Sequence, residues 1–331
     1  MNSGVDVVDW SHVIQEENEI FENPTRTRPK GFLDILKWIA FEKRTAWPAW
    51  VDSEISAEVK KSVKPGEIHT VMINHATVLI QTSEANILTD PVFSERTSPV
   101  SWAGPKRRRS PGLKIKDLPP IDLVLVSHNH YDHMDLSSLV EIWKKFDPHF
   151  VLPLRNFHFL FEAGIYTSKV SELNWWEKFT FKKDLQIFLT PAQHWSARGT
   201  RDRNRSLWGG FWIEVGEPKQ RIFFAGDTGY ADHFLSIQKK WGNPDLSFLP
   251  IGAYEPRWFM KDQHMNPEEA VQAHLDLKSE KSVAIHWGTW PLTDEGMRDP
   301  VLHLKEALTK LSVPTERFVI LENGEHLAVS L

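Results

Sequence analysis

The sequence predicts an α/β or α+β fold in which helices cover β-sheets, and three observations lead to this prediction. Short β-type runs bounded by turn residues begin near residue 67 and recur towards the C-terminus. Segments with helical periodicity lie between these runs. At 331 residues, with 41% hydrophobic and 25% charged residues, the chain has an ordinary globular composition and can bury a sizeable core.

Residues 1–66 differ from the rest of the chain, and we expect them to form an N-terminal extension that packs on the main body. This part is irregular and mixed in charge, and it contains four prolines. Within it, residues 31–41 predict a short helix with a large apolar surface. Such a helix could pack on the main body or face membrane lipid, and the pattern leaves both interpretations open.

The main body, residues 67–331, is expected to form one domain of strands and intervening helices. We expect strands at 69–80, 87–89, 121–126, 185–189, 211–215 and 221–225. We expect helices at 136–145, 156–163, 267–275 and 300–311. The chain has no heptads, tandem repeats or low-complexity tract, which argues against a repeat architecture.

The charge and the cysteine count restrict the classes of function. A formal net charge of −5 argues against a general nucleic-acid binder, although the basic stretches 106–109 and 198–205 could form positive surface patches. The chain has no cysteine, which excludes disulfides, thiolate zinc sites and cysteine nucleophiles. Any metal ion must therefore be bound by nitrogen and oxygen ligands.

Targeting signals are not apparent in the sequence. The first 20 residues lack the basic and apolar regions of a signal peptide. No apolar run approaches the roughly 20 residues that a membrane-spanning helix needs. We therefore expect a cytoplasmic protein, with peripheral attachment to a membrane as an alternative.

The stretch SHNHYDHMD, residues 127–135, carries the strongest chemical signal. It places His128, His130, Asp132 and His133 directly after the apolar run 121–126. Beyond the end of a strand, a loop can wrap four such side chains around a small volume. Imidazole and carboxylate groups are suitable ligands for zinc, iron or manganese, so the HxHxDH spacing predicts a metal site with room for two cations.

Three further candidate ligands follow β-type runs in the same manner. His194 comes after the run 185–189, Asp227 after 221–225 and His286 after 282–285, and turn residues adjoin each of them. Each position alone would more often be structural. Together with HxHxDH they complete a set of nitrogen and oxygen ligands large enough for two metal ions.

These residues resemble the metal motifs of the metallo-β-lactamase superfamily. Longer blocks resemble one branch of it, the N-acylphosphatidylethanolamine-hydrolysing phospholipase D family and its bacterial relatives. The blocks are HATVLI at 75–80, LTDPVFSERTSP at 88–99, GPKRRRSP at 104–111, FFAGDTGY at 223–230, PIGAYEPRWFMKDQH at 250–264 and AIHWGT at 284–289. The resemblance covers residues 67–331 and extends more loosely into the segment before them.

The resemblance implies a four-layered αβ/βα sandwich, with two central mixed sheets covered by helices and two Zn²⁺ ions at one edge. One ion would be held by His128, His130 and His194. The other would be held by Asp132, His133 and His286, and Asp227 would bridge the two. Other divalent metals such as Mn²⁺ or Fe²⁺ are alternatives.

The implied reaction is hydrolysis of an N-acylphosphatidylethanolamine to an N-acylethanolamine and phosphatidic acid. Two metal ions about 4 Å apart can share a water, lower its pKa and stabilise the charge that develops on an attacked phosphorus. We hypothesise attack by a metal-bridging hydroxide, with Asp132 as a catalytic group that orients the water or carries its proton. The resemblance also places Gln263 and His264 near the metals, where they would bind substrate and His264 would donate a hydrogen bond or a proton. A structural role for His264, bonded to a loop carbonyl, is equally open.

Two alternatives remain for the function. A similar hydrolase could act on a smaller soluble phosphodiester or a lactone. A protein of another class, either a di-iron redox centre or a non-hydrolytic scaffold, could keep the same ligands. The expected partners are a phospholipid substrate and an anionic membrane surface but no nucleic acid, and the resemblance adds a homodimer as a candidate assembly.

Overall fold

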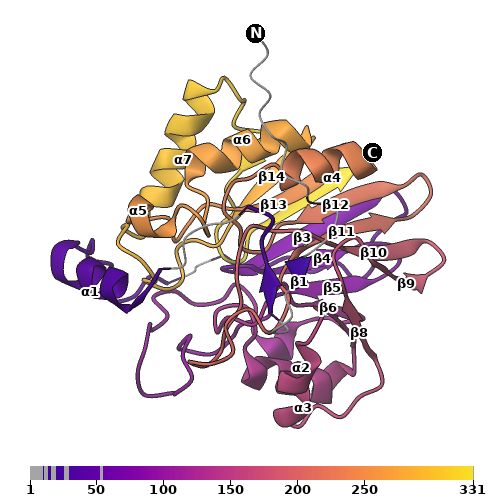
Figure 1. Cartoon of the computed structure of the whole chain (residues 1–331). Helices are drawn as coiled ribbons and strands as arrows, with labels where there is room; N and C mark the ends of the chain where they lie inside the picture. Colours follow the sequence, from indigo (N-terminus) through magenta and orange to yellow (C-terminus); the bar gives the residue numbers. More distant parts are fainter. Residues whose placement is uncertain (1–9, 11–13, 16–19, 26–29, 53–54, 331) are drawn as a thin grey trace.

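The computed structural model describes residues 10, 14–15, 20–25, 30–52 and 55–330. Within them, two seven-stranded mixed sheets pack face to face, and helices cover both outer faces (Figure 1). This arrangement confirms the expected α/β class and the four-layered αβ/βα sandwich.

The first sheet has the strand order β16-β3-β4-β5-β6-β7-β8. Its strands are β3 (Glu67–Asn74), β4 (Thr77–Gln81), β5 (Asn86–Thr89), β6 (Leu123–Leu125), β7 (His149–Pro153), β8 (Val170–Leu173) and β16 (His326–Ser330). Neighbours from β16 to β5 are antiparallel, and neighbours from β5 to β8 are parallel. The parallel part is in register at Thr89↔Leu125 and Leu125↔Val151.

The second sheet has the order β15-β14-β13-β12-β11-β10-β9. Its strands are β9 (Lys178–Lys182), β10 (Leu185–Thr190), β11 (Gly210–Val215), β12 (Gln220–Phe224), β13 (Leu246–Pro250), β14 (Lys281–Ile285) and β15 (Phe318–Val319). It repeats the plan of the first sheet, because β9 to β12 are antiparallel and β12 to β15 are parallel. Each sheet therefore has a parallel half whose strands all end at the same edge.

Strand alternation builds the core between the sheets. On β10, Leu185, Ile187 and Leu189 are fully buried and belong to one cluster with inward residues of the first sheet such as Leu123 and Leu125. Residues that point outward belong to two separate clusters under the helices. Burial on both faces explains why these strands are almost continuously apolar.

The helices divide between the two outer faces. α2 (Leu136–Phe146) and α3 (Phe157–Glu162) cover the first sheet, and α4 (His233–Trp241), α6 (Pro267–Leu277) and α7 (Asp299–Lys310) cover the second. α6 begins with a capping box, in which the side chain of Asn266 accepts from the Glu269 N–H and that of Glu269 accepts from the Asn266 N–H. A 3-10 turn at Ile115–Asp117 and the short α5 (Arg257–Met260) lie in connecting segments.

The expected elements differ from the structure mainly at their ends. The expected strand at 69–80 is a hairpin of β3 and β4 that turns at His75, whose φ is +47°. The run 121–126 contributes only Leu123–Leu125 to the sheet, which leaves the following residues free to form the HxHxDH loop.

Two parts of the N-terminal region are anchored differently. β1 (Ile14–Gln15) pairs with β2 (Phe21–Glu22), and Phe21 is buried in the core between the sheets. α1 (Phe32–Phe41) instead projects from the body of the sandwich (Figure 1). The division into an extension and a main domain at residue 66 stays a prediction.

No helix among the described residues is long and apolar enough to cross a bilayer.

Candidate metal centre

The candidate ligands come from the ends of strands in both sheets. The HxHxDH loop connects β6 to α2, while His194 follows β10, Asp227 follows β12 and His286 follows β14. Each ligand lies just beyond the carboxyl end of its strand, so the packing of the two sheets brings all seven predicted metal-binding side chains together.

Two backbone conformations are needed for this convergence. Gly226 has φ +61°, and a Cβ there would lie 2.7 Å from the Cβ of Ser127, so only glycine lets the Asp227 loop approach the HxHxDH loop. His286 has φ +63°, which is uncommon for a residue with a side chain. Such strained positions cluster at functional sites.

The first group of ligands is compact enough for one ion. His130 Nδ1 lies 2.9 Å from His128 Nε2 and 3.2 Å from His194 Nε2. Asp227 Oδ2 lies 3.9 Å from the Nε2 atoms of both His128 and His194. Ligands about 2.0–2.1 Å from a tetrahedral zinc ion lie roughly 3.3 Å from one another, so these spacings fit such a centre.

The second group fits equally well. Asp227 Oδ2 lies 3.2 Å from His133 Nε2 and 3.1 Å from His286 Nε2. Asp132 Oδ2 lies 3.6 Å and 3.4 Å from the same two nitrogens. A single oxygen of Asp227 therefore adjoins both groups, as a bridging ligand would.

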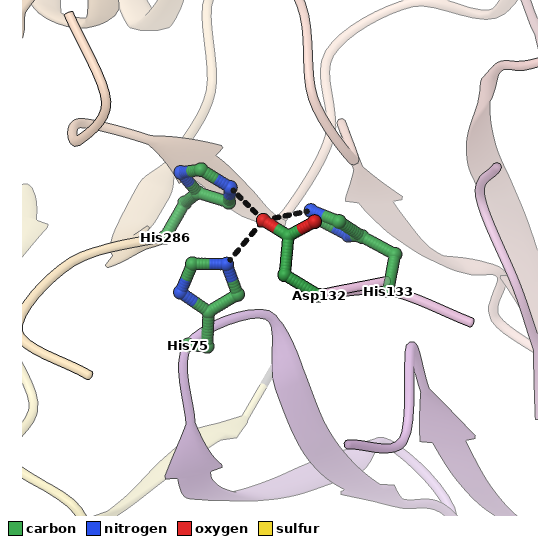
Figure 2. Close-up of side chains that lie close together, drawn as sticks. All are labelled: His75, Asp132, His133 and His286. Carbon is green, nitrogen blue, oxygen red and sulfur yellow. Dashed lines mark hydrogen bonds and ion pairs between the residues drawn. The ribbon is translucent and has the colours of Figure 1, made fainter. Parts of the chain in front are cut away.

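His75 also contacts the second group. Its Nε2 lies 3.1 Å from Asp132 Oδ2. Figure 2 shows the rings of His75, His133 and His286 turned towards the Asp132 carboxylate from three sides. His75 thereby fixes the orientation of Asp132.

Outer contacts hold several of the imidazole rings. His133 Nδ1 lies 2.7 Å from a carboxylate oxygen of Asp90, and His128 Nδ1 lies 2.9 Å from Ser127 Oγ. His194 Nδ1 donates to the backbone carbonyl of Gln263 at 2.9 Å. Metal-binding histidines commonly donate their second nitrogen in this way, which directs the other towards the ion.

Asp90 is a functional residue that the sequence interpretation missed. It is fully buried and also accepts the N–H and the Oγ–H of Ser127, each at 2.7 Å. Its position directly after β5 is the same signal that identified His194 and Asp227.

Electrostatics favour a cation at this centre. Burial raises the pKa of Asp132 and Asp227, but the neighbouring histidines outweigh burial and hold both pKa values well below their usual range. Burial lowers the pKa of His286, but Asp227 and Asp132 outweigh it and raise the pKa to about 9. Both carboxylates are thus charged and are balanced by protons on imidazole, and a divalent cation can replace those protons.

A cavity of about 540 Å³ opens onto the centre. His130, Asp132, Asp227 and His264 are among the residues that line it. Its walls include apolar residues of α1, α5 and a nearby loop, namely Ile35, Trp38, Phe259, Met260 and Leu292, together with the cationic Lys30, Arg198 and Arg203. The cavity is of the size and mixed polarity typical of a small-molecule site.

Gln263 and His264 both lie at this cavity. His264 Nδ1 is 3.8 Å from Asp227 Oδ2, and burial lowers the pKa of His264 to about 4, so the ring is neutral at pH 7. Arg257 braces their loop by bonding to the His264 carbonyl at 2.9 Å and to both carboxylate oxygens of Glu269.

The basic stretch 106–109 is not a continuous surface patch. Arg107 and Arg109 are only 4% and 5% exposed. Arg107 donates to the carbonyls of Val92 and Ser94, and Arg109 pairs with Glu322. Two of the four cations therefore brace the loops around the site, because buried charges must find internal partners.

Comparison with known proteins identifies relatives along most of the chain. A family model for the Beta-lactamase superfamily domain matches residues 85–287. The chain is 42% identical over 264 residues to N-acyl-phosphatidylethanolamine-hydrolyzing phospholipase D 1 of Caenorhabditis elegans, covering 76% of this chain and 73% of that protein. It is 40% identical over 233 residues to the mitochondrial N-acyl-phosphatidylethanolamine-hydrolyzing phospholipase D of Saccharomyces cerevisiae, covering 68% of this chain and 48% of that one.

Solved structures share the fold at lower identity. A metallo hydrolase of the archaeon Ignicoccus hospitalis aligns with a TM-score of 0.59 and 21% identity, covering 80% of this chain and 99% of that one. An isothiocyanate hydrolase from Delia radicum gut bacteria aligns with a TM-score of 0.61 and 19% identity, covering 80% of this chain and all of that one.

Proposed function

Because the chain belongs to the N-acylphosphatidylethanolamine-hydrolysing phospholipase D family of the beta-lactamase superfamily and is a metal-dependent hydrolase, we propose that it is a di-zinc phosphodiesterase. It would release an N-acylethanolamine and phosphatidic acid from an N-acylphosphatidylethanolamine. The observation that carries this proposal is the single oxygen of Asp227, which adjoins two ligand groups beside a partly apolar cavity.

The spacing of the residues supports two zinc ions in the arrangement that the resemblance implies. One ion would be held by His128, His130 and His194 and the other by Asp132, His133 and His286, with Asp227 shared. When bound, two such ions supply Lewis acidity and lower the pKa of a coordinated water. All the donors are nitrogen or oxygen atoms, so Mn²⁺ and Fe²⁺ are chemically acceptable substitutes.

Asp132 is suited to handle the proton of the attacking water. Its carboxylate lines the cavity and is held by His75, and its pKa stays low despite burial. A fixed carboxylate can accept a hydrogen bond from water and orient it towards the phosphorus.

His264 is suited to stabilise the phosphoryl group or the leaving group. Its neutral imidazole can donate one hydrogen bond to a phosphoryl oxygen or to the leaving alkoxide. Gln263 adjoins it at the cavity wall, where its amide can bind the polar part of the substrate.

The volume of the cavity limits which substrates can fit inside it. A volume of about 540 Å³ holds a headgroup and part of a chain but not a complete lipid with several acyl chains. A lipid substrate must therefore leave its chains outside, whereas a small phosphodiester or lactone would fit entirely. Because of this size, hydrolysis of a smaller soluble phosphodiester or a lactone is the second candidate function.

The surface of α1 favours lipid. Leu33, Ile39 and Phe41 are 79%, 69% and 79% exposed, while Ile35 and Trp38 of the same helix line the cavity. An exposed apolar patch of this kind marks a site of contact with a partner or a membrane.

Two hydrogen bonds hold α1 against the body. Trp38 Nε1 donates to Asp294 at 2.6 Å, and Trp258 Nε1 donates to Glu42 at 2.8 Å. Lys37 and Lys43 add exposed positive charge on and beside the helix. We infer that α1 docks on an anionic membrane surface and brings the cavity mouth to the lipid headgroups.

The lipid reaction predicts a defined pair of products. Zinc-loaded protein mixed with N-acylphosphatidylethanolamine in detergent micelles should give phosphatidic acid and N-acylethanolamine, measured by mass spectrometry. Asp132→Asn should lower turnover by at least about 100-fold, because the amide cannot accept the proton and is a weaker ligand for the second metal ion. Cleavage of a water-soluble phosphodiester with the lipid untouched would move the assignment to the second candidate.

His264→Ala should lower turnover about 100-fold while the zinc content, measured by elemental analysis, stays at the parent value, because general acid catalysis is lost and the metal ligands remain. His158→Ala, at an exposed ring on α3, serves as the control. Unchanged turnover would remove His264 from the mechanism.

The double substitution Ile39→Asp and Phe41→Asp should weaken binding to vesicles that contain anionic lipid by more than about tenfold. Each apolar side chain withdrawn from lipid loses roughly 1.5–3 kcal/mol. Co-sedimentation with vesicles measures this, and Leu302→Asp, at a 54% exposed position on α7, is the matched control. Vesicle binding equal to that of the parent would rule out docking through α1.

A further inference from the structure

The N-terminal segment, whose described residues are 10, 14–15 and 20–25, contacts the candidate metal centre through Asn23. The side-chain Nδ2 of Asn23 donates to the backbone carbonyl of His194 at 2.7 Å. The backbone N–H of His194 donates back to Asn23 Oδ1 at 3.3 Å. One amide side chain therefore engages both backbone groups of a proposed zinc ligand, as a neighbouring strand would.

Buried aromatic residues hold this segment in place. Phe21, two residues before Asn23, is 1% exposed, and its N–H donates to the Asn204 carbonyl at 2.8 Å. Trp10 is also 1% exposed, and its carbonyl accepts from Trp176 Nε1 at 2.7 Å. The segment is thus docked on the core, and Asn23 acts from a fixed position.

The same contacts organise the loop that begins at His194. The Asn204 N–H donates to the Ser196 carbonyl at 2.8 Å, which closes the loop on itself. Trp195, within this loop, packs edge-on against the ring of His130 at 4.4 Å between centroids. The N-terminal segment therefore lies against a loop that carries one proposed ligand and contacts another.

We propose that the N-terminal segment helps to shape the metal centre, with Asn23 as a positioning residue for His194. This inference rests on the proposed function, because it takes His194 to be a zinc ligand. The ring of His194 is fixed by the Gln263 carbonyl and its backbone by Asn23. Loss of Asn23 would let the backbone shift while the ring stays tethered at one nitrogen.

The effect is confined to one of the two zinc positions. Among the described residues, none in 20–25 forms a hydrogen bond or an ion pair with Asp132, His133 or His286. Asn23 therefore acts directly on the group of His128, His130 and His194, whereas Asp90 and His75 brace the other group.

The test is a zinc titration of the full chain against a chelator of known affinity. In Asn23→Ala, one of the two zinc equivalents should bind about tenfold more weakly and the other should keep the parent affinity. Loss of a residue that hydrogen-bonds a metal ligand typically weakens metal binding by at least this factor. Asn23→Asp keeps the acceptor but loses the donor of the shorter bond, so it should show the same loss of zinc affinity at one position only. Asn243→Ala, at an exposed asparagine outside the loop, should match the parent.

Thermal unfolding of the same variants in excess chelator separates positioning from folding. If Asn23 positions His194, its substitution should weaken zinc binding at one position while the melting temperature in chelator stays near that of the parent. Two unchanged affinities, or an equal loss at both positions together with a lowered melting temperature in chelator, would overturn it. A parent chain that binds no zinc would instead overturn the proposed function on which it rests.

Discussion

Two carboxylates buried among histidines are the constraint on which the rest of the molecule depends. Asp132 is 14% and Asp227 2% exposed at the side chain, and an isolated buried carboxylate would cost several kcal/mol. Each is instead surrounded by imidazole nitrogens at 3.1–3.9 Å. The carboxylates need positive charge beside them, and a divalent ion meets that need better than protons because one ion binds a carboxylate and several neutral imidazoles at once.

The topology of the two sheets makes this arrangement possible. Each sheet ends its parallel half at one edge, and facing the two sheets brings those edges together. No single strand could supply the ligands, since they follow β6, β10, β12 and β14. The core between the sheets fixes the separation of the two edges, so its tight packing translates into fixed distances between ligands.

The sequence predicted the parts of this structure that repeat a local pattern. Apolar runs followed by a turn and a histidine or aspartate identified the ends of β10, β12 and β14, and the HxHxDH spacing supplied the central loop. Asn23 was missed because its role depends on a contact with a residue 171 positions away. Asp90 follows β5 and carries the same signal as His194, but only its contact with His133 in the structure reveals its role. Arg107 and Arg109 were misjudged for a related reason, since a run of cations does not reveal that a folded loop turns two of them inward.

The most direct test of this account is to locate the metal ions in crystals of the zinc-loaded protein by anomalous scattering at the zinc absorption edge. A centre with Asp227 shared should give two peaks, one among His128, His130 and His194 and one among Asp132, His133 and His286, with Asp227 within bonding distance of both. A single peak, or two peaks of which only one contacts Asp227, would contradict the shared-carboxylate centre.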